Sequence, residues 1–201
     1  AKSRKPQTMF FPVDESIRRR ARSPHELAMV NLLLFNLLML IALLAGSFLQ
    51  SGSALADYKL AGVMVPLLIS LAIVAYSFSR VRRAATEDHW FVASHWRLAT
   101  ARYRFLLIAY VVGAALIGLG WLLSLAQKNP GMQELMFVAL QRVAIAPILI
   151  ALMVLIMLES GALYQAGRGE VPDGLAKSYP PPADLPASDM EVPEPGASSQ
   201  S

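Results

Sequence analysis

The sequence predicts an all-α integral membrane protein with four transmembrane helices, and three observations support this. The chain of 201 residues is 55% hydrophobic and 16% charged, whereas soluble domains are about 45–50% apolar and about 25% charged. Four apolar stretches are each long enough to cross about 30 Å of hydrocarbon, which takes roughly 20 residues. Basic residues gather at alternate ends of these stretches, as in proteins oriented by the positive-inside rule. The predicted spans are about residues 27–49, 60–79, 105–126 and 135–158.

The first span, residues 27–49, sets the topology of everything after it. It holds 23 residues without a charge, which is longer than the apolar region of about 7–15 residues in a secretory signal peptide, so we expect a retained helix. The segment Ser23-Pro24-His25-Glu26 has the pattern of a helix start, with Ser at the N-cap and Glu closing a capping box. We therefore expect the helix to begin at Ser23, after a basic N-terminal arm of residues 1–22.

The basic residues near the span ends predict the orientation. Residues 1–26 hold seven Lys/Arg and the connection 80–104 holds six, whereas the two short loops hold one each, Lys59 and Lys128. Because cytoplasmic loops carry the excess of Lys and Arg, we expect both termini in the cytoplasm. The predicted location is the inner (plasma) membrane, as a multi-pass protein with N-in and C-in topology.

The connection 80–104 combines arginines with aromatic residues, next to the membrane on the predicted inner side. This composition is typical of an interfacial belt that binds anionic lipid headgroups, and equally of a docking surface for a protein or a cofactor-bearing partner. The segment could also continue the neighbouring spans as a helical hairpin that protrudes inward. Nucleic acid is not an expected partner at this position. The candidate contacts to a partner or to lipid here are Trp90, Trp96, Arg97 and Arg102.

The C-terminal segment differs in composition from the rest of the chain. Residues 165–201 contain seven of the 13 prolines, among them Pro180-Pro181-Pro182, together with Ser, Gly and acidic residues. Such a segment buries too little apolar surface to offset its ordering entropy, and the triple proline favours polyproline II. We expect an extended or disordered Pro-rich acidic tail over residues 161–201, after a transmembrane domain of residues 23–160.

Two further candidate contact residues lie inside the spans. Arg142 is the only charged residue there. It either snorkels to the outer interface or meets an anion, a lipid phosphate or an acidic group of another subunit. Asn36 lies near mid-membrane, and Asn31 precedes it by five residues, which is about 140° around an α-helix. We expect the two amides on different faces, where each forms an interhelix hydrogen bond; for Asn36 the alternative is contact with a substrate.

The sequence argues against several kinds of chemistry. It contains no cysteine, which excludes disulfides, thiolate catalysis and iron–sulfur ligation. No histidine lies within a span, so haem ligation between the helices is not expected, and no carboxylate lies there for proton or cation coupling. His89 and His95 are about 240° apart on a helix and cannot hold one metal ion. We assign no catalytic, cofactor-binding or metal-binding residue, and we do not expect an enzyme.

The function that these patterns favour is a non-catalytic accessory, assembly or scaffolding subunit of a larger membrane protein complex, with a respiratory or photosynthetic complex as one option. Its expected partners are membrane lipids and other membrane-protein subunits. Two alternatives stay open. The first is a small transporter or channel component that binds an anion near Arg142, and the second is a quinone- or lipid-binding subunit of a membrane enzyme with a shared site.

Overall fold

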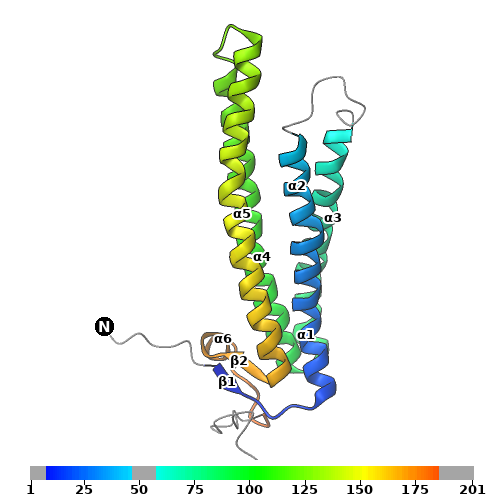
Figure 1. Ribbon diagram of the computed structural model, residues 1–201. Helices are drawn as coiled ribbons and strands as arrows, with labels where there is room; N and C mark the ends of the chain where they lie inside the picture. Colours follow the sequence, from blue (N-terminus) through cyan, green and yellow to red (C-terminus); the bar gives the residue numbers. More distant parts are fainter. Residues whose placement is uncertain (1–7, 47–57, 186–201) are drawn as a thin grey trace, which may run out of the picture.

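The computed structural model describes residues 8–46 and 58–185, and within them the chain is almost entirely helical, in agreement with the predicted all-α membrane protein. Four helical segments are long and apolar enough to cross a membrane. They form two pairs, α2 with α3 and α4 with α5, which lie side by side and converge at the end that holds the short strands (Figure 1). The elements are β1 (Thr8–Phe10), α1 (Glu15–Val30), η1 (Asn31–Asn36), α2 (Leu37–Gly46), α3 (Lys59–Glu87), α4 (Trp90–Ser124), α5 (Pro130–Arg168), β2 (Glu170–Pro172) and α6 (Asp173–Ser178).

The first helix begins at Glu15, so the predicted start at Ser23 is wrong. Asp14 takes the N-cap position, and Pro24 lies buried inside α1. Residues 15–22 are helical because they pack on the protein: Ala21 is fully buried and Ile17 contacts the same core. Tertiary packing here outweighs the local capping signal, as it often outweighs helix propensity.

The first span contains a π-helical segment, η1, between α1 and α2. In a π-helix the hydrogen bonds run from residue i to i+5, so five residues bring the chain back to nearly the same face. The expectation that Asn31 and Asn36 lie on different faces is therefore wrong, since both are buried and Asn36 Nδ2 donates to the backbone oxygen of Asn31 at 2.9 Å.

The connection 80–104 is a helical hairpin that continues the neighbouring spans, which is one of the interpretations that its sequence allowed. Helix α3 runs to Glu87, and α4 begins at Trp90. The buried carboxylate of Asp88 at the turn pairs with Arg20 of α1 and Arg80 of α3. His89 is the N-cap of α4, because its Nδ1 accepts a hydrogen bond from the backbone nitrogen of Phe91 at 3.2 Å.

The beginning of the predicted tail is folded, contrary to our expectation of an extended or disordered segment from residue 161. Helix α5 continues to Arg168 and ends at Gly169, whose φ of 80° lies in the left-handed region. Strand β2 then pairs antiparallel with β1, and α6 follows. The apolar residues responsible are buried at Ala162, Ala166, Val171 and Ala176. Residues 186–201 of the predicted tail lie outside the described residues.

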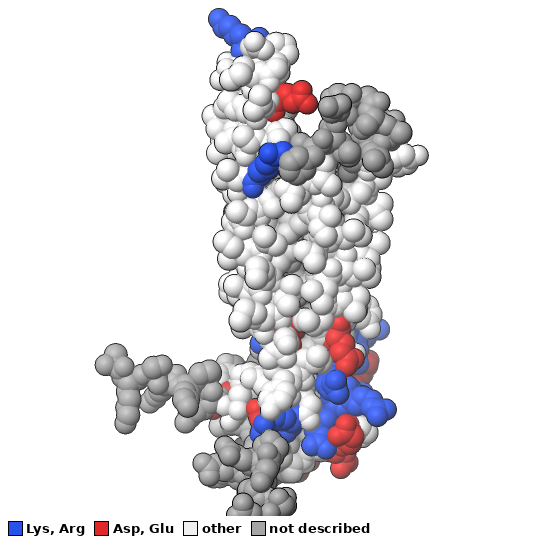
Figure 2. All heavy atoms as spheres, viewed as in Figure 1, with Lys and Arg blue, Asp and Glu red and all other residues white. Residues whose placement is uncertain are grey.

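The molecule has two apolar cores, one at the end that holds β1, β2 and α6 and one among the four spans. The charged side chains gather at the end with β1, β2 and α6, while the middle of the visible face is almost uncharged (Figure 2). We call the charged region the basic end. The core of the basic end consists of Phe11, Ala21, Ala84, Phe91, Val92, Ala93, Trp96, Ala166, Val171 and Ala176. The membrane core consists of Ala28, Leu32, Leu40, Val74, Tyr103, Leu106, Ile145, Ile148, Leu152 and Leu155.

Candidate functional site

A chain of buried titratable groups joins three helices where the two cores meet. His25 of α1 lies between Glu159 of α5 and His95 of α4, and each of the three residues is at most 1% exposed. The distance from His25 Nδ1 to Glu159 Oε2 is 2.6 Å, and that from His25 Nε2 to His95 Nδ1 is 2.9 Å. Because a carboxylate only accepts hydrogen bonds, Nδ1 of His25 donates to Glu159. We call these residues, together with Arg102, the His–Glu network.

Arg102 compensates the buried carboxylate from the other side. Its Nη1 lies 3.4 Å from Glu159 Oε1 and donates to the backbone oxygen of Leu158 at 2.8 Å. Burial of a charge is costly unless the charge is paired and hydrogen-bonded, and both oxygens of Glu159 have such a partner. Arg102 therefore serves an internal contact in this structure.

His95 is held neutral by its surroundings. It lies on α4 ten residues before Phe105, where the apolar stretch of that helix begins. The pKa of His95 is lowered from 6.5 to about 3, mainly by burial and further by the nearby His25 and Arg102, while a hydrogen bond with the backbone of Glu170 acts in the opposite direction. In chemical terms the His–Glu network could pass a proton along its length, but its members are closed to solvent.

The His–Glu network lacks the arrangement of a metal centre. Both ring nitrogens of His25 are engaged, by Glu159 and by His95. Within residues 8–46 and 58–185, no group of three His, Cys, Asp or Glu side chains could hold a metal ion. His89 and His95 lie in different surroundings, since His89 caps α4 and His95 faces His25.

A second buried network lies among the spans, beside the membrane core, and contains the predicted contact residue Asn36. Its Nδ2 donates to Ser70 Oγ of α3 at 3.0 Å, and its Oδ1 accepts from the Tyr110 hydroxyl of α4 at 2.5 Å. The Ser70 and Tyr110 oxygens are 2.6 Å apart. The expected interhelix hydrogen bonds of Asn36 are thus present, and this network joins η1, α3 and α4.

The two predicted contact tryptophans belong to the packing of the basic end. Trp90 packs on the Phe11 ring at 4.9 Å and donates through Nε1 to the backbone oxygen of Tyr179 at 3.2 Å. Trp96 is 5% exposed, and the Arg80 guanidinium lies 5.5 Å from the centre of its ring. Both indoles therefore hold α4 against the segments around it.

Arg97 lines an open cavity at the basic end, which we call the basic cavity. The volume of this cavity is about 730 Å³. The Arg97 guanidinium lies 3.5 Å from the centre of the Tyr179 ring, in a cation–π contact that fixes one wall. The cavity lies between α3, α4 and the segment of α6, and its lining residues are Phe78, Val81, Arg82, Ala85, Arg97, Thr100, Ala101, Arg104, Leu175 and Tyr179.

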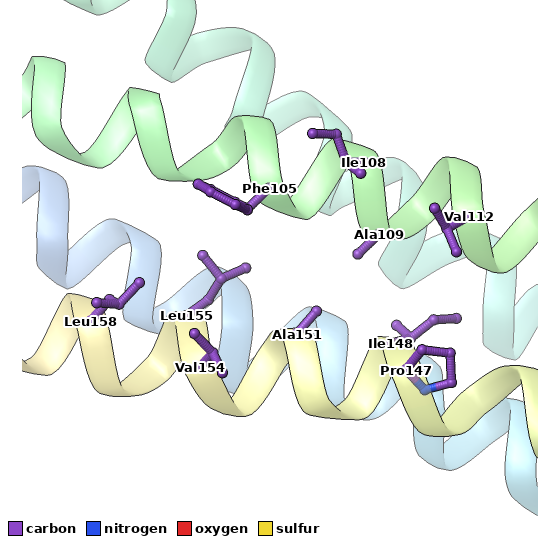
Figure 3. A pocket seen from close by; sticks show the side chains of 10 residues that line it. All are labelled: Phe105, Ile108, Ala109, Val112, Pro147, Ile148, Ala151, Val154, Leu155 and Leu158. Carbon is purple, nitrogen blue, oxygen red and sulfur yellow. The ribbon is translucent and has the colours of Figure 1, made fainter.

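A second open feature is an apolar groove of about 330 Å³ between α4 and α5. Figure 3 shows its side chains facing one another from the two helices. Ala109 and Ala151 leave room in its middle, and Pro147 closes one end. We call it the apolar groove, and it is lined by Phe105, Ile108, Ala109, Val112, Pro147, Ile148, Ala151, Val154, Leu155 and Leu158.

Arg142 lies apart from the other predicted contact residues. It is exposed on α5, and it lines neither the basic cavity nor the apolar groove. Its neighbour Gln141 reaches across to the first span, where Nε2 donates to the backbone oxygen of Leu43 at 3.4 Å.

Sequence reasoning missed Glu159, which joins His25 to Arg102 in the His–Glu network. Glu159 directly follows the predicted span 135–158, so it was counted with the polar residues beyond the membrane. One signal could have found it: Arg102 lies a similar distance outside the span 105–126, at the same end of an antiparallel neighbour. A pair of opposite charges at matching positions on adjacent helices predicts an ion pair.

Comparison of the chain with protein-family models, with curated proteins and with solved structures found no match.

Proposed function

We propose that this protein is a non-catalytic subunit of a larger membrane protein complex, in which it assembles or holds other subunits. One observation carries the proposal, namely the folded basic end. Segments from both described ends of the chain build it, with β1 paired to β2 beyond the apolar belt. It has an apolar core of its own. A small four-span protein that folds such a module outside its spans presents a shaped surface to a partner.

The buried titratable groups support the same proposal. His25, His95 and Glu159 have the chemistry of acid–base residues, yet they are used as contacts between α1, α4 and α5 and are shielded from water. A general acid or base has to reach its substrate within hydrogen-bonding distance. The His–Glu network therefore acts as a clamp that holds the basic end on the spans.

Tyr164 is the docking residue that we favour on the basic end. Tyr164 is 62% exposed. Nη1 of Arg168 donates a hydrogen bond to the Tyr164 hydroxyl at 2.6 Å, and this contact fixes the ring. Tyrosine and arginine are enriched among the residues that dominate binding energy at protein interfaces. A preorganised aromatic side chain also loses little entropy on binding.

The test is purification of the tagged full-length chain from its native membranes in mild detergent, followed by native electrophoresis and quantitative mass spectrometry. We expect a partner at fixed stoichiometry with the wild type. With Tyr164→Ala its recovery should fall about tenfold or more, because loss of an interface hot spot costs about 2 kcal/mol or more. The matched control is Tyr58→Ala, since Tyr58 is 70% exposed at the opposite end of α3. Recovery of the wild type only as a monomer or homo-oligomer would refute the proposal.

The apolar groove favours a second candidate function, a lipid- or quinone-binding subunit of a membrane enzyme with a shared site. Its described lining residues are all apolar, so the groove suits a hydrocarbon or isoprenoid tail, and a partner would supply polar contacts to a quinone ring. Extraction of the purified protein and chromatography with mass detection test for a bound quinone. A stoichiometric quinone that is lost in Ala109→Leu would favour this candidate over the first.

A further inference from the structure

We infer that the basic cavity and the apolar groove form one site for an anionic phospholipid. In this site Arg82, Arg97 and Arg104 hold the phosphate, and one acyl chain lies in the groove between α4 and α5. The inference does not depend on the assembly role proposed first, because a lipid site of this kind can exist in an isolated protein. It uses the same groove as the second candidate function and names the class of lipid.

The charge of the basic cavity is the first argument. Three of its lining residues are arginines, and none of the lining residues that the structure describes is acidic. Most other arginines of the basic end are paired with a carboxylate: Arg18, Arg20, Arg22, Arg80, Arg102 and Arg168. In the described part of the chain, Arg82, Arg97 and Arg104 form no ion pair. Guanidinium groups bind phosphate through paired hydrogen bonds, so an external phosphate suits this cavity.

The position of the cavity along α4 is the second argument. Arg97, Arg104 and Ile108 follow one another at spacings of seven and four residues, which places them on one face of the helix. The two arginines line the basic cavity, and Ile108 lines the apolar groove. Arg104 is directly followed by Phe105, where the apolar stretch and the groove both begin. The cavity therefore lies at the height of the headgroups, and the groove continues from it into the belt.

The length of the groove is the third argument. Along α5 its lining runs from Leu158 to Pro147, and the eleven steps between these residues span about 16 Å at about 1.5 Å per residue. One leaflet is half of a hydrocarbon core that is about 30 Å thick. The groove thus extends through one leaflet, which is the depth that an acyl chain occupies. A free phosphate ion would use the cavity alone and would make no contact with the groove.

The experiment is native mass spectrometry of the full-length protein in detergent, with equal amounts of palmitoyl-oleoyl phosphatidylglycerol and phosphatidylcholine. We expect retained phosphatidylglycerol to exceed phosphatidylcholine by about a hundredfold. Each of the three arginines near the headgroup is expected to raise the affinity by somewhat less than tenfold. The variant R82Q/R97Q/R104Q should lose this preference. The matched control is R19Q/R83Q, because Arg19 and Arg83 are exposed at the same end but do not line the cavity. Equal retention of the two lipids by the wild type would overturn the inference, whether or not the variants fold.

A second arm separates a phospholipid from a soluble phosphate. Ala109→Leu fills the groove, whereas Ala115→Leu adds the same group at an exposed position of α4 outside it. We expect Ala109→Leu to lower retained phosphatidylglycerol severalfold and Ala115→Leu to leave it unchanged. Inorganic phosphate at millimolar concentration should not displace the lipid. Displacement by phosphate would assign the cavity to a soluble anion and refute the lipid site. Equal retention in both alanine variants would show that no acyl chain lies in the groove and would overturn the single site.

Discussion

Replacement of Glu159 by Gln tests whether the His–Glu network stabilises the junction of the two cores. Glutamine keeps the shape of the side chain but removes its charge and places an amide donor where only acceptors fit. One oxygen of Glu159 now accepts from His25 at 2.6 Å, and the other lies 3.4 Å from Arg102. On the Arg102 side the amide would face a donor, and on the His25 side it is satisfied only if the Nδ1 proton of His25 moves to Nε2, which reverses the hydrogen bond to His95. Removal of one partner from a buried ion pair costs about 3–5 kcal/mol, and we expect a loss of unfolding free energy in that range.

The assay is reversible unfolding of the purified protein in mild detergent, followed by tryptophan fluorescence. Two of the three tryptophans, Trp90 and Trp96, lie in α4 at the basic end, and Trp121→Phe as a common background confines the signal to the region that the substitution perturbs. The control is Glu134→Gln, because Glu134 is an exposed carboxylate of the same helix as Glu159. A Glu159→Gln protein within about 0.5 kcal/mol of the wild type, the usual range for surface substitutions, would show that the network contributes little to stability.

Three further perturbations give expected outcomes. His95 has a folded-state pKa of about 3, below its unfolded value of 6.5. Between pH 3 and pH 6.5 the unfolded state therefore binds more protons at His95 than the folded state does. The free energy of unfolding is thus highest above pH 6.5 and falls as the pH decreases, by up to about 1.4 kcal/mol per pH unit. Melting temperatures at pH 7 and pH 5 check this, and His95→Gln should flatten the slope. Asn36→Leu should cost about 1 kcal/mol, the scale of interhelix hydrogen bonds in membranes, measured by the same unfolding assay. Gly169→Ala should cost about 1–2 kcal/mol, because its φ is 80° and a Cβ would lie 2.8 Å from the backbone oxygen of Phe11; limited proteolysis would detect release of β1.

The spans could be predicted from sequence because their signal is local and one-dimensional. A run of apolar residues must cross a hydrocarbon layer of fixed thickness, and helices are the form that satisfies every backbone group there. The contacts of the His–Glu network have no such signal. His25 and Glu159 are 134 residues apart, and His25 and His95 are 70 apart. Whether they meet depends on how the helices cross, which local composition does not determine.

The misjudged C-terminal segment shows a different limit. Averaged over residues 161–201, the prolines and acids dominate the composition and predict disorder. The first part nevertheless folds, because Ala162 and Ala166 share one face of α5 and Val171 follows in β2. Together with Ala176 of α6, these four buried residues suffice, because β1 and α1 already offer a surface on which they pack. An average over the segment conceals this, whereas the positions of the individual apolar residues predict it.

The arginines of the basic end differ in whether they are already paired with a carboxylate. The positive-inside rule counts every Lys and Arg near a span, whatever its partner, and on that count the N-terminal arm is the most basic segment. Its Arg18, Arg20 and Arg22 are nevertheless paired with Glu15, Asp88 and Glu26. A lipid phosphate competes poorly for a guanidinium that already holds a carboxylate. In the lipid site that we propose, the cations are therefore Arg82, Arg97 and Arg104 of the α3–α4 hairpin, which form no ion pair in the described part of the chain, and not the paired arginines of the arm that sets the predicted orientation.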